Sequence, residues 1–410
     1  MKVGLLAHDF LTWQGGRDFL DIFVRALLSG PQKIECFLIL PVNGPRAWFR
    51  SIRLSCRALV KTSRWKWSPP DQQYRLSELT TLDPSVTRCY TDLGRHALLR
   101  CIERNNLELV LPAVHSLGKD FPIPWIGYAY DFQHRYYGNY FTDKDRLSRD
   151  SHFEAIFNDP EVTVVNSRSV ASDAERFVHP IRASISVLPF TPFLRSEWLK
   201  TDEGILERYG LVKSSPYFLI SNQFWPHKNH RVACEAARLL RRKGTEFNLA
   251  FTGTGNTMET ESTLASLKKD FSDLISDGTL RLLGWIPKAD QIDLTKKASA
   301  VIQPSLFEGG PGGGAAYHAL ALGQRLIASD LPVNREIHTG QVSFFPPDSA
   351  DALAVLMENC LQKDTLIPSP DWEALKHQSE ANLKECGYVI HEAISLCLKR
   401  FDSRRQLQAT

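Results

Sequence analysis

The sequence lacks the features that define several common classes of protein. It has no run of about 18 apolar residues, so we predict no membrane-spanning helix. None of its eight cysteines forms a CxxC pair or a cysteine–histidine cluster with zinc spacing, which favours reduced thiols and no metal site. The net charge is only +3, which argues against a general nucleic-acid binder. The apolar run at the start is too short for a signal peptide, and we expect a cytoplasmic protein, soluble or attached to the inner face of the membrane.

The chain does have enough apolar material for two hydrophobic cores, since 43% of its 410 residues are apolar. Strand-like runs alternate with helical patterns over residues 2–190 and again over residues 217–330. This alternation is typical of parallel sheets with helices on both faces. We therefore predict an α/β fold of two doubly wound Rossmann-like domains facing across a cleft. The predicted parts are an N-terminal domain over 1–195, a C-terminal domain over 196–390, and a C-terminal helix over 391–410 that packs back on the N-terminal domain.

A glycine-rich turn stands between a strand-like run and a helical pattern in PSLFEGGPGGGAAYHALALG, residues 304–323. Five of the six residues from Gly309 to Gly314 are glycines. Such a turn exposes backbone N–H groups at the positive end of a helix dipole, and the missing side chains let an anion approach. The turn therefore predicts a phosphate or diphosphate cradle, with Glu308 facing whatever the phosphate carries. The alternative is an ordinary flexible loop.

A lysine follows the first strand of the second alternating series, in SNQFWPHKNH, residues 221–230. Lys228, flanked by His227 and His230, could neutralise a phosphate as a compact charge. The alternative is a solvated lysine in the first turn of a helix. The phosphate interpretation is favoured because Lys228 and the glycine turn both stand at the end of a strand.

Several segments resemble the donor domain of family 4 glycosyltransferases, which have the GT-B fold. They are SNQFWPHKNH, LLGWIP, PSLFEGG and ALALGQRLIASDLPVNREI, within residues 214–345, and more weakly GGRDFL and YAYDFQHRYYGNYF. The resemblance implies a retaining enzyme that moves a hexose from a UDP or GDP sugar, without a metal or other cofactor. It also implies an N-terminal domain that binds the acceptor, a cell-surface glycan or its lipid-linked precursor.

The resemblance assigns roles to individual residues. Glu308 would contact the hydroxyls of the donor sugar, and Lys228 would stabilise the leaving diphosphate. The N–H groups of Gly312, Gly313 and Gly314 would bind the same diphosphate. The full set of implied donor-binding residues is Gly15, Gly16, Asn222, Gly253, Gly255, Trp285, Ile286, Gly312, Gly313, Gly314, Tyr317 and His318.

The chain departs from the family pattern at two positions. The arginine usually found six positions before the lysine is Asn222, and the glutamate that usually holds the ribose aligns with His318. His318 or Tyr317 could still hydrogen-bond a ribose. These departures leave open a catalytically inactive nucleotide-sugar-binding protein. A dinucleotide-dependent oxidoreductase is a weaker alternative, because no GxGxxG follows the first strand.

His134, in YDFQH, is a third candidate catalytic residue, since the family often has a histidine near the transferred sugar. Asp131 lies three positions earlier and could share one face of a turn with it. The alternative is a loop histidine without a function.

A stripe of basic residues covers residues 46–67 and contains no acid. Arg50, Arg53 and Arg57 recur at helical spacing, which is typical of an amphipathic helix that binds an anionic membrane surface or an acidic partner, and we expect them to contact the membrane or the acceptor. The alternative is a core helix with a solvated basic face.

Overall fold

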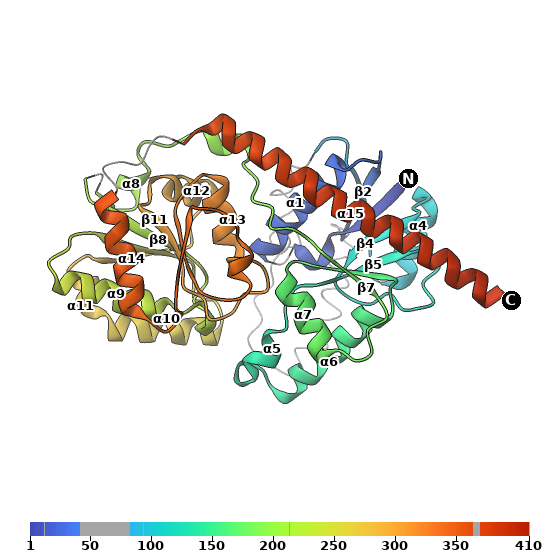
Figure 1. Ribbon diagram of the computed structural model, residues 1–410, viewed down its shortest axis with the longest axis horizontal. Helices are drawn as coiled ribbons and strands as arrows, with labels where there is room; N and C mark the ends of the chain where they lie inside the picture. The colour runs from blue at the N-terminus through green and yellow to red at the C-terminus, as the bar shows by residue number, and fades with distance from the viewer. Residues whose placement is uncertain (12, 42–82, 93, 213, 364–369, 410) are drawn as a thin grey trace. The chain divides into compact units, whose positions relative to one another are not determined.

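The computed structural model describes residues 1–11, 13–41, 83–92, 94–212, 214–363 and 370–409 (Figure 1). The basic stripe with Arg50, Arg53 and Arg57 lies outside these residues. The chain divides into two compact units. Unit 1 consists of 1–166, 170–189 and 383–410, and unit 2 of 167–169 and 190–382.

Unit 1 is built on a parallel sheet of seven strands in the order β3-β2-β1-β4-β5-β6-β7. Strands β4, β5 and β6 are buried along their whole length and mostly apolar, as expected of strands covered on both faces. The strands are β1 Lys2–Leu6, β2 Glu35–Pro41, β3 Thr87–Thr91, β4 Leu109–Ala113, β5 Trp125–Ala129, β6 Val162–Val165 and β7 Ser184–Val187.

Helices connect these strands, and the loops that lead into them leave the carboxyl edge of the sheet. They are η1 His8–Phe10, α1 Gln14–Ser29, α4 Arg95–Asn105, α5 Gln133–Tyr136, η3 Gly138–Tyr140, α6 Asp143–Asn158 and α7 Arg168–Phe177. Helix α1 begins at Gln14, so Gly15 and Gly16 lie in its first turn.

The chain ends in one long helix, α15 Trp372–Ala409, drawn in red in Figure 1. The sequence pattern placed the start of this helix at 391, nineteen residues too late. From residue 383 the helix belongs to unit 1, where Gly387 lies so close to α1 that an added Cβ would meet Ala26 O at 2.4 Å. His391 Nε2 lies 2.8 Å from Leu27 O and fixes the crossing. The end of the chain therefore packs on the N-terminal domain.

Unit 2 repeats the architecture with six parallel strands in the order β10-β9-β8-β11-β12-β13. The strands are β8 Tyr217–Ser221, β9 Asn248–Thr252, β10 Leu280–Gly284, β11 Ala300–Gln303, β12 Leu326–Ser329 and β13 Val342–Phe345. The helices are η4 Ser196–Leu199, α8 Ile205–Arg208, η5 Pro226–Lys228, α9 His230–Arg242, α10 Met258–Asp270, α11 Ser272–Ser276, α12 Lys288–Lys297, α13 Gly313–Ala321, η6 Asn334–Glu336 and α14 Ala350–Lys363.

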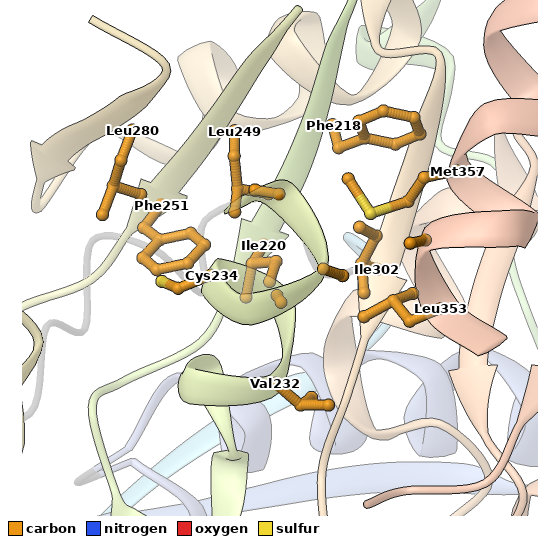
Figure 2. Packing of buried hydrophobic residues seen from close by; sticks show 14 of the residues in the cluster. Phe218, Ile220, Val232, Cys234, Leu249, Phe251, Leu280, Ile302, Leu353 and Met357 are labelled. Atoms are coloured by element: carbon orange, nitrogen blue, oxygen red, sulfur yellow. The ribbon is translucent and has the colours of Figure 1, made fainter. Parts of the chain in front are cut away.

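One core of unit 2 lies between the sheet and the two packed helices α9 and α14. Figure 2 shows side chains from all three: Phe218 and Ile220 of β8, Cys234 of α9, and Leu353 and Met357 of α14. The apolar positions of α9 recur at three- and four-residue spacing, so the sequence pattern predicts its buried face. This packing fixes the carboxyl end of β8, from which η5 and Lys228 follow.

In both sheets the direction of the strand order reverses beside the strand that comes first in the chain. In unit 2 this point lies between β8 and β11, and in unit 1 between β1 and β4. Loops leaving neighbouring strands here run in opposite directions, so the space between them receives ligands in doubly wound folds.

Candidate functional site

The two residues predicted to be catalytic in the second half of the chain meet at the point in unit 2 where the strand order reverses. Lys228 ends η5, which follows β8, and Glu308 stands in the loop after β11. Lys228 Nζ lies 2.5 Å from Glu308 Oε1. The side chains are 17% and 9% exposed, so this ion pair is largely shielded from water. The sequence separates the residues by 80 positions, and the sheet topology brings them together.

Glu308 is held in its ionised form. Burial alone would raise its pKa, but the charge and hydrogen bond of Lys228, with the Ser305 hydroxyl, outweigh burial and lower the pKa below the ordinary value of 4.5. Asn222, predicted to bind the donor directly, instead donates to the Gln303 side chain at 2.8 Å, and Gln303 donates to Glu308 at 2.7 Å.

The two histidines beside Lys228 are neutral at physiological pH. Burial and the charge of Lys228 lower the pKa of His227 to about 4 and that of His230 to about 3. His230 stacks on Phe224 with ring centroids 4.7 Å apart. Lys228 therefore supplies the positive charge of this turn.

The glycine turn has the conformation that only glycine adopts readily. Gly312, at φ 62°, is the N-cap of α13, and Gly313 follows at φ 58°. A Cβ on Gly312 would lie 2.2 Å from Ala316 Cβ, and one on Gly313 would lie 3.0 Å from Glu308 Oε2. A Cβ on Gly314 would meet nothing within 4 Å. Two of these glycines are thus required by packing, and the third faces open space.

The backbone donors of this turn differ in what they contact. The N–H of Gly312 donates to Asn334 Oδ1 at 2.7 Å, and that of Gly313 donates to Gly310 O at 3.2 Å. Asn334 is completely buried and also donates to Ser329 O, so it is a fixed partner. No oxygen in the described part of the chain accepts from the N–H groups of Gly314 and Ala315. Of the three N–H groups predicted to bind a diphosphate, those of Gly312 and Gly313 are therefore already used within the protein.

The loops after β9 and β10 hold four more of the residues predicted to bind the donor: Gly253, Gly255, Trp285 and Ile286. Gly253, at φ 131°, has Asn222 O 2.3 Å from the place of its Cβ and donates to Gly284 O at 2.8 Å, so it joins three strand ends. Gly255 packs against the backbone of Glu261. Trp285 is 60% exposed and Ile286 is buried.

The two residues predicted to hold a ribose lie on α13 with different neighbours. His318 is buried, with Lys288 Nζ 2.7 Å from its Nε2 and the Trp198 ring 5.5 Å away, centroid to centroid. Tyr317 is half-buried and packs edge-on against Phe190 at 4.4 Å. The imidazole of His318 therefore contacts other side chains of unit 2 on the sides given by Lys288 and Trp198.

In unit 1 the side chains of Asp131 and His134 have different partners. Asp131 Oδ1 accepts from Arg149 at 2.8 Å, whereas His134 Nε2 lies 2.8 Å from Asp150 Oδ1. His134 is buried and stacks on Phe153, and burial lowers its pKa. These contacts are those of a histidine inside the core of unit 1.

The first turn of α1 is covered by an aromatic ring that the sequence analysis did not single out. A Cβ on Gly15 or Gly16 would lie 2.5 Å or 2.7 Å from the Trp13 indole, so both glycines make room for it. Trp13 itself is 47% exposed and donates from Nε1 to Asp9 O at 3.2 Å.

A group of ionisable side chains near Trp13 was also missed. Asp9 Oδ1 lies 3.1 Å from His8 Nδ1 and 3.7 Å from His115 Nε2, and the His115 and His152 rings are 5.0 Å apart. Burial would raise the pKa of Asp9, but the neighbouring histidines lower it; burial lowers that of His152 to about 4. The signal was weak, because only the order of β1 and β4 in the sheet brings Asp9 and His115 together.

Among the described residues, no three histidine, cysteine, aspartate or glutamate side chains are grouped so that they could hold a metal ion. Asp143 and Asp145 form an Asp-x-Asp pattern, but both lie in the first turn of α6, where Asp143 pairs with Arg146 and Asp145 bonds to Thr142. The seven described cysteines are free. None of the described helices combines the length and apolar character needed to cross a bilayer.

Comparisons with known proteins agree with this architecture. Residues 202–384 match the family model for glycosyl transferases group 1. A sucrose-phosphate synthase from Thermosynechococcus elongatus has a TM-score of 0.62 at 13% identity, with 100% of this chain and 99% of that chain covered. A glycosyltransferase from Rickettsia africae has a TM-score of 0.58 at 15% identity, with 100% of this chain and 97% of that chain covered. HepE from Anabaena, in complex with UDP, has a TM-score of 0.57 at 11% identity, with 99% of this chain and 100% of that chain covered. No curated protein matches in sequence.

At these identities the likeness concerns the fold alone. The predicted class, a GT-B fold of two doubly wound Rossmann-like domains, is confirmed by the two parallel sheets and these structural neighbours.

Proposed function

We propose that this protein is a retaining, metal-independent glycosyltransferase of family 4 that moves a hexose from a nucleoside diphosphate sugar. The observation that carries the proposal is the Lys228–Glu308 pair beside the N-terminus of α13, within the segment that matches the group 1 family. A cation, a fixed carboxylate and unoccupied backbone donors meet there at a ligand-binding sheet edge.

The charges suit a nucleoside diphosphate donor. Lys228 has three donors, so it can turn from Glu308 toward the diphosphate and stabilise the charge that develops as this group leaves. The N–H groups of Gly314 and Ala315 would add donors at the positive end of α13. Glu308, ionised, would accept hydrogen bonds from the hydroxyls of the hexose. The neighbour HepE has been solved with UDP and with UDP-glucose, which supports a UDP sugar over a GDP sugar.

For the acceptor we propose a hydroxyl-rich glycan or its lipid-linked precursor, bound by unit 1. The Asp9 carboxylate, held ionised among histidines, would accept hydrogen bonds from hydroxyls. The exposed Trp13 indole beside it offers an apolar face to a sugar ring.

A second candidate is a nucleotide-sugar-binding protein without activity. Two observations favour it: position 222 provides a neutral amide where the family has an arginine, and His318 is occupied by Lys288 and Trp198.

Incubation with a panel of UDP and GDP sugars separates the two candidates. We expect slow release of free nucleotide by hydrolysis from one donor, because water can replace an absent acceptor, and we expect EDTA to leave the rate unchanged. Calorimetric binding of a donor without any release would instead support the inactive protein. Activity that EDTA abolishes and Mg²⁺ or Mn²⁺ restores would contradict metal independence.

The basic stripe remains a prediction about the membrane. Each arginine near an anionic surface adds about 1 kcal/mol of attraction, screened by salt. Cosedimentation should therefore require vesicles with anionic lipid and weaken as salt rises. Replacement of Arg50, Arg53 and Arg57 by glutamine should reduce it, while nucleotide release continues. A wild-type protein that ignores anionic vesicles at low salt would leave the stripe as a solvated face.

A further inference from the structure

The carboxylate of Glu308 is the end of a chain of side-chain amides. Gln303, the last residue of β11, is fully buried, and its Nε2 donates to Glu308 Oε1 at 2.7 Å and to Ser305 Oγ at 3.2 Å. Its Oε1 accepts from Asn222 Nδ2 at 2.8 Å. Both amide hydrogens and the amide oxygen of Gln303 are therefore used. The opposite orientation would bring two acceptor oxygens together at Glu308, so the amide has one favourable orientation.

The backbone under this chain is fixed by the centre of the sheet. Gln303 pairs with Ala328 of β12, and the buried Ser329 hydroxyl bonds to the carbonyl oxygens of Gln303 at 3.1 Å and Ser305 at 2.5 Å. Asn222 directly follows β8, the strand on the other side of β11. Groups mounted on adjacent central strands hold their geometry better than groups mounted on loops.

The consequence for Glu308 is a difference between its two oxygens. Oε1 receives both Lys228 and Gln303. Oε2 faces the position where a Cβ of Gly313 would stand, 3.0 Å away, and the Ser305 hydroxyl adds a further hydrogen bond to the carboxylate. Since hydrogen bonds to the charged form favour it, the amide also helps to keep this buried carboxylate ionised. The other ionisable groups that act on Glu308 are Lys228 and His227.

We infer that Gln303 is a positioning residue that orients and ionises Glu308, and that Asn222 acts through Gln303 by fixing the amide. The inference rests on the proposed function for what Oε2 contacts, the hydroxyls of the donor sugar, but not for the hydrogen bonds themselves. A neutral relay gives Glu308 a second donor without placing a second cation beside Lys228. This is a role for position 222 other than contact with the donor phosphates.

The test replaces Gln303 by methionine, which has similar length and no amide. The pKa of Glu308 is followed by carbon NMR of carboxyl-labelled glutamate and assigned with Glu308→Gln. We expect this pKa to rise by about one unit, and the acidic limb of the turnover–pH profile to move up with it, because the ionised form loses a donor. Turnover should fall about 10- to 100-fold, as for loss of a charge-assisted hydrogen bond, with nucleotide affinity within about twofold.

Asn222→Ala, at a half-buried position, should shift the same pKa in the same direction by less, and it serves if Gln303→Met does not fold. The matched control is Gln324→Met, which removes another buried amide, one that donates to Lys296 O at 2.6 Å. It should leave the pKa of Glu308 and the pH profile unchanged.

Two results are separable. A folded Gln303→Met protein with an unchanged Glu308 pKa and an unchanged acidic limb overturns the relay, whether or not the enzyme is active. If the wild type neither binds nor cleaves any nucleotide sugar while Gln303→Met still raises the Glu308 pKa, the relay holds and the proposed function fails.

Discussion

Replacing Lys228 by methionine should lower turnover with the preferred nucleotide sugar about 100- to 1000-fold. This corresponds to about 2.7–4 kcal/mol of transition-state stabilisation, the cost of removing one donor from a developing oxyanion. The measurement is nucleotide release under saturating donor. The control is Lys243→Met, which removes another paired lysine, 3.0 Å from Glu358 and far more exposed. Turnover of the Lys228 variant equal to that of the control would contradict the assignment.

The same substitution should affect stability in a way that depends on pH. In the wild type the folded-state pKa of Glu308 lies below 4.5, so the ion pair stabilises the fold fully above that pH and loses this effect as pH falls through the lowered pKa. Without Lys228, burial raises the pKa of Glu308, and the ionised carboxylate is unpaired at neutral pH. Loss of one partner of a buried pair costs about 3–5 kcal/mol, and the residual exposure here places the expected cost at or below the lower end.

The difference in melting temperature between wild type and Lys228→Met should therefore be largest near pH 7 and shrink toward pH 4. The double variant Lys228→Met with Glu308→Gln should recover most of the lost stability, since no charge stays buried alone, but none of the activity. A double variant that is less stable than Lys228→Met would show that the pair does not account for the loss.

Substitution of Gly312 by alanine should have the largest effect of any single methyl added to the glycine turn. An L-residue at φ 62° costs about 1–2 kcal/mol, and the 2.2 Å approach to the buried Ala316 Cβ adds overpacking of about 1–3 kcal/mol. For a domain of this size the sum lowers the melting temperature of unit 2 by roughly 5–15 °C, followed by calorimetry.

Gly314→Ala is the matched control at the next exposed position. Its Cβ would meet nothing, and alanine favours helix over glycine by about 0.8–1.0 kcal/mol, so stability should be equal or slightly higher. If the N-terminus of α13 binds the diphosphate, the added methyl should weaken UDP binding by about tenfold in titration calorimetry, since glycine there lets the backbone approach a ligand. Unchanged UDP affinity in Gly314→Ala would argue against a cradle at residues 314–315.

Much of the fold could be predicted because its signals are local. The alternation of apolar strands with amphipathic helices is enough to predict two parallel-sheet domains. The C-terminal helix was predicted nineteen residues short, because its first half has few buried positions and its apolar stripe becomes regular only from Leu383. Cys386, Ile390, Ile394 and Cys397 continue that stripe.

The meeting of Lys228 and Glu308 was implied by the order of the motifs, which stand after strands that a doubly wound sheet places side by side. The roles of the individual glycines could be predicted only in part. Sequence shows that the turn is rich in glycine, but not that Asn334 occupies the N–H of Gly312 from 22 positions away.

By itself, then, the sequence determined the fold class and showed that a lysine, a glutamate and a glycine-rich turn stand after strands; that they bind a phosphate stays a prediction. Periodicity and turn composition encode these features within a few residues. Only the tertiary structure decided that Gln303 links Asn222 to Glu308 and that His134 and His318 have internal partners. It also decided that Asp9, His115 and His152 lie together in unit 1. Each of these facts joins residues on separate strands and helices. Their contact depends on sheet order and side-chain packing, which no local pattern specifies.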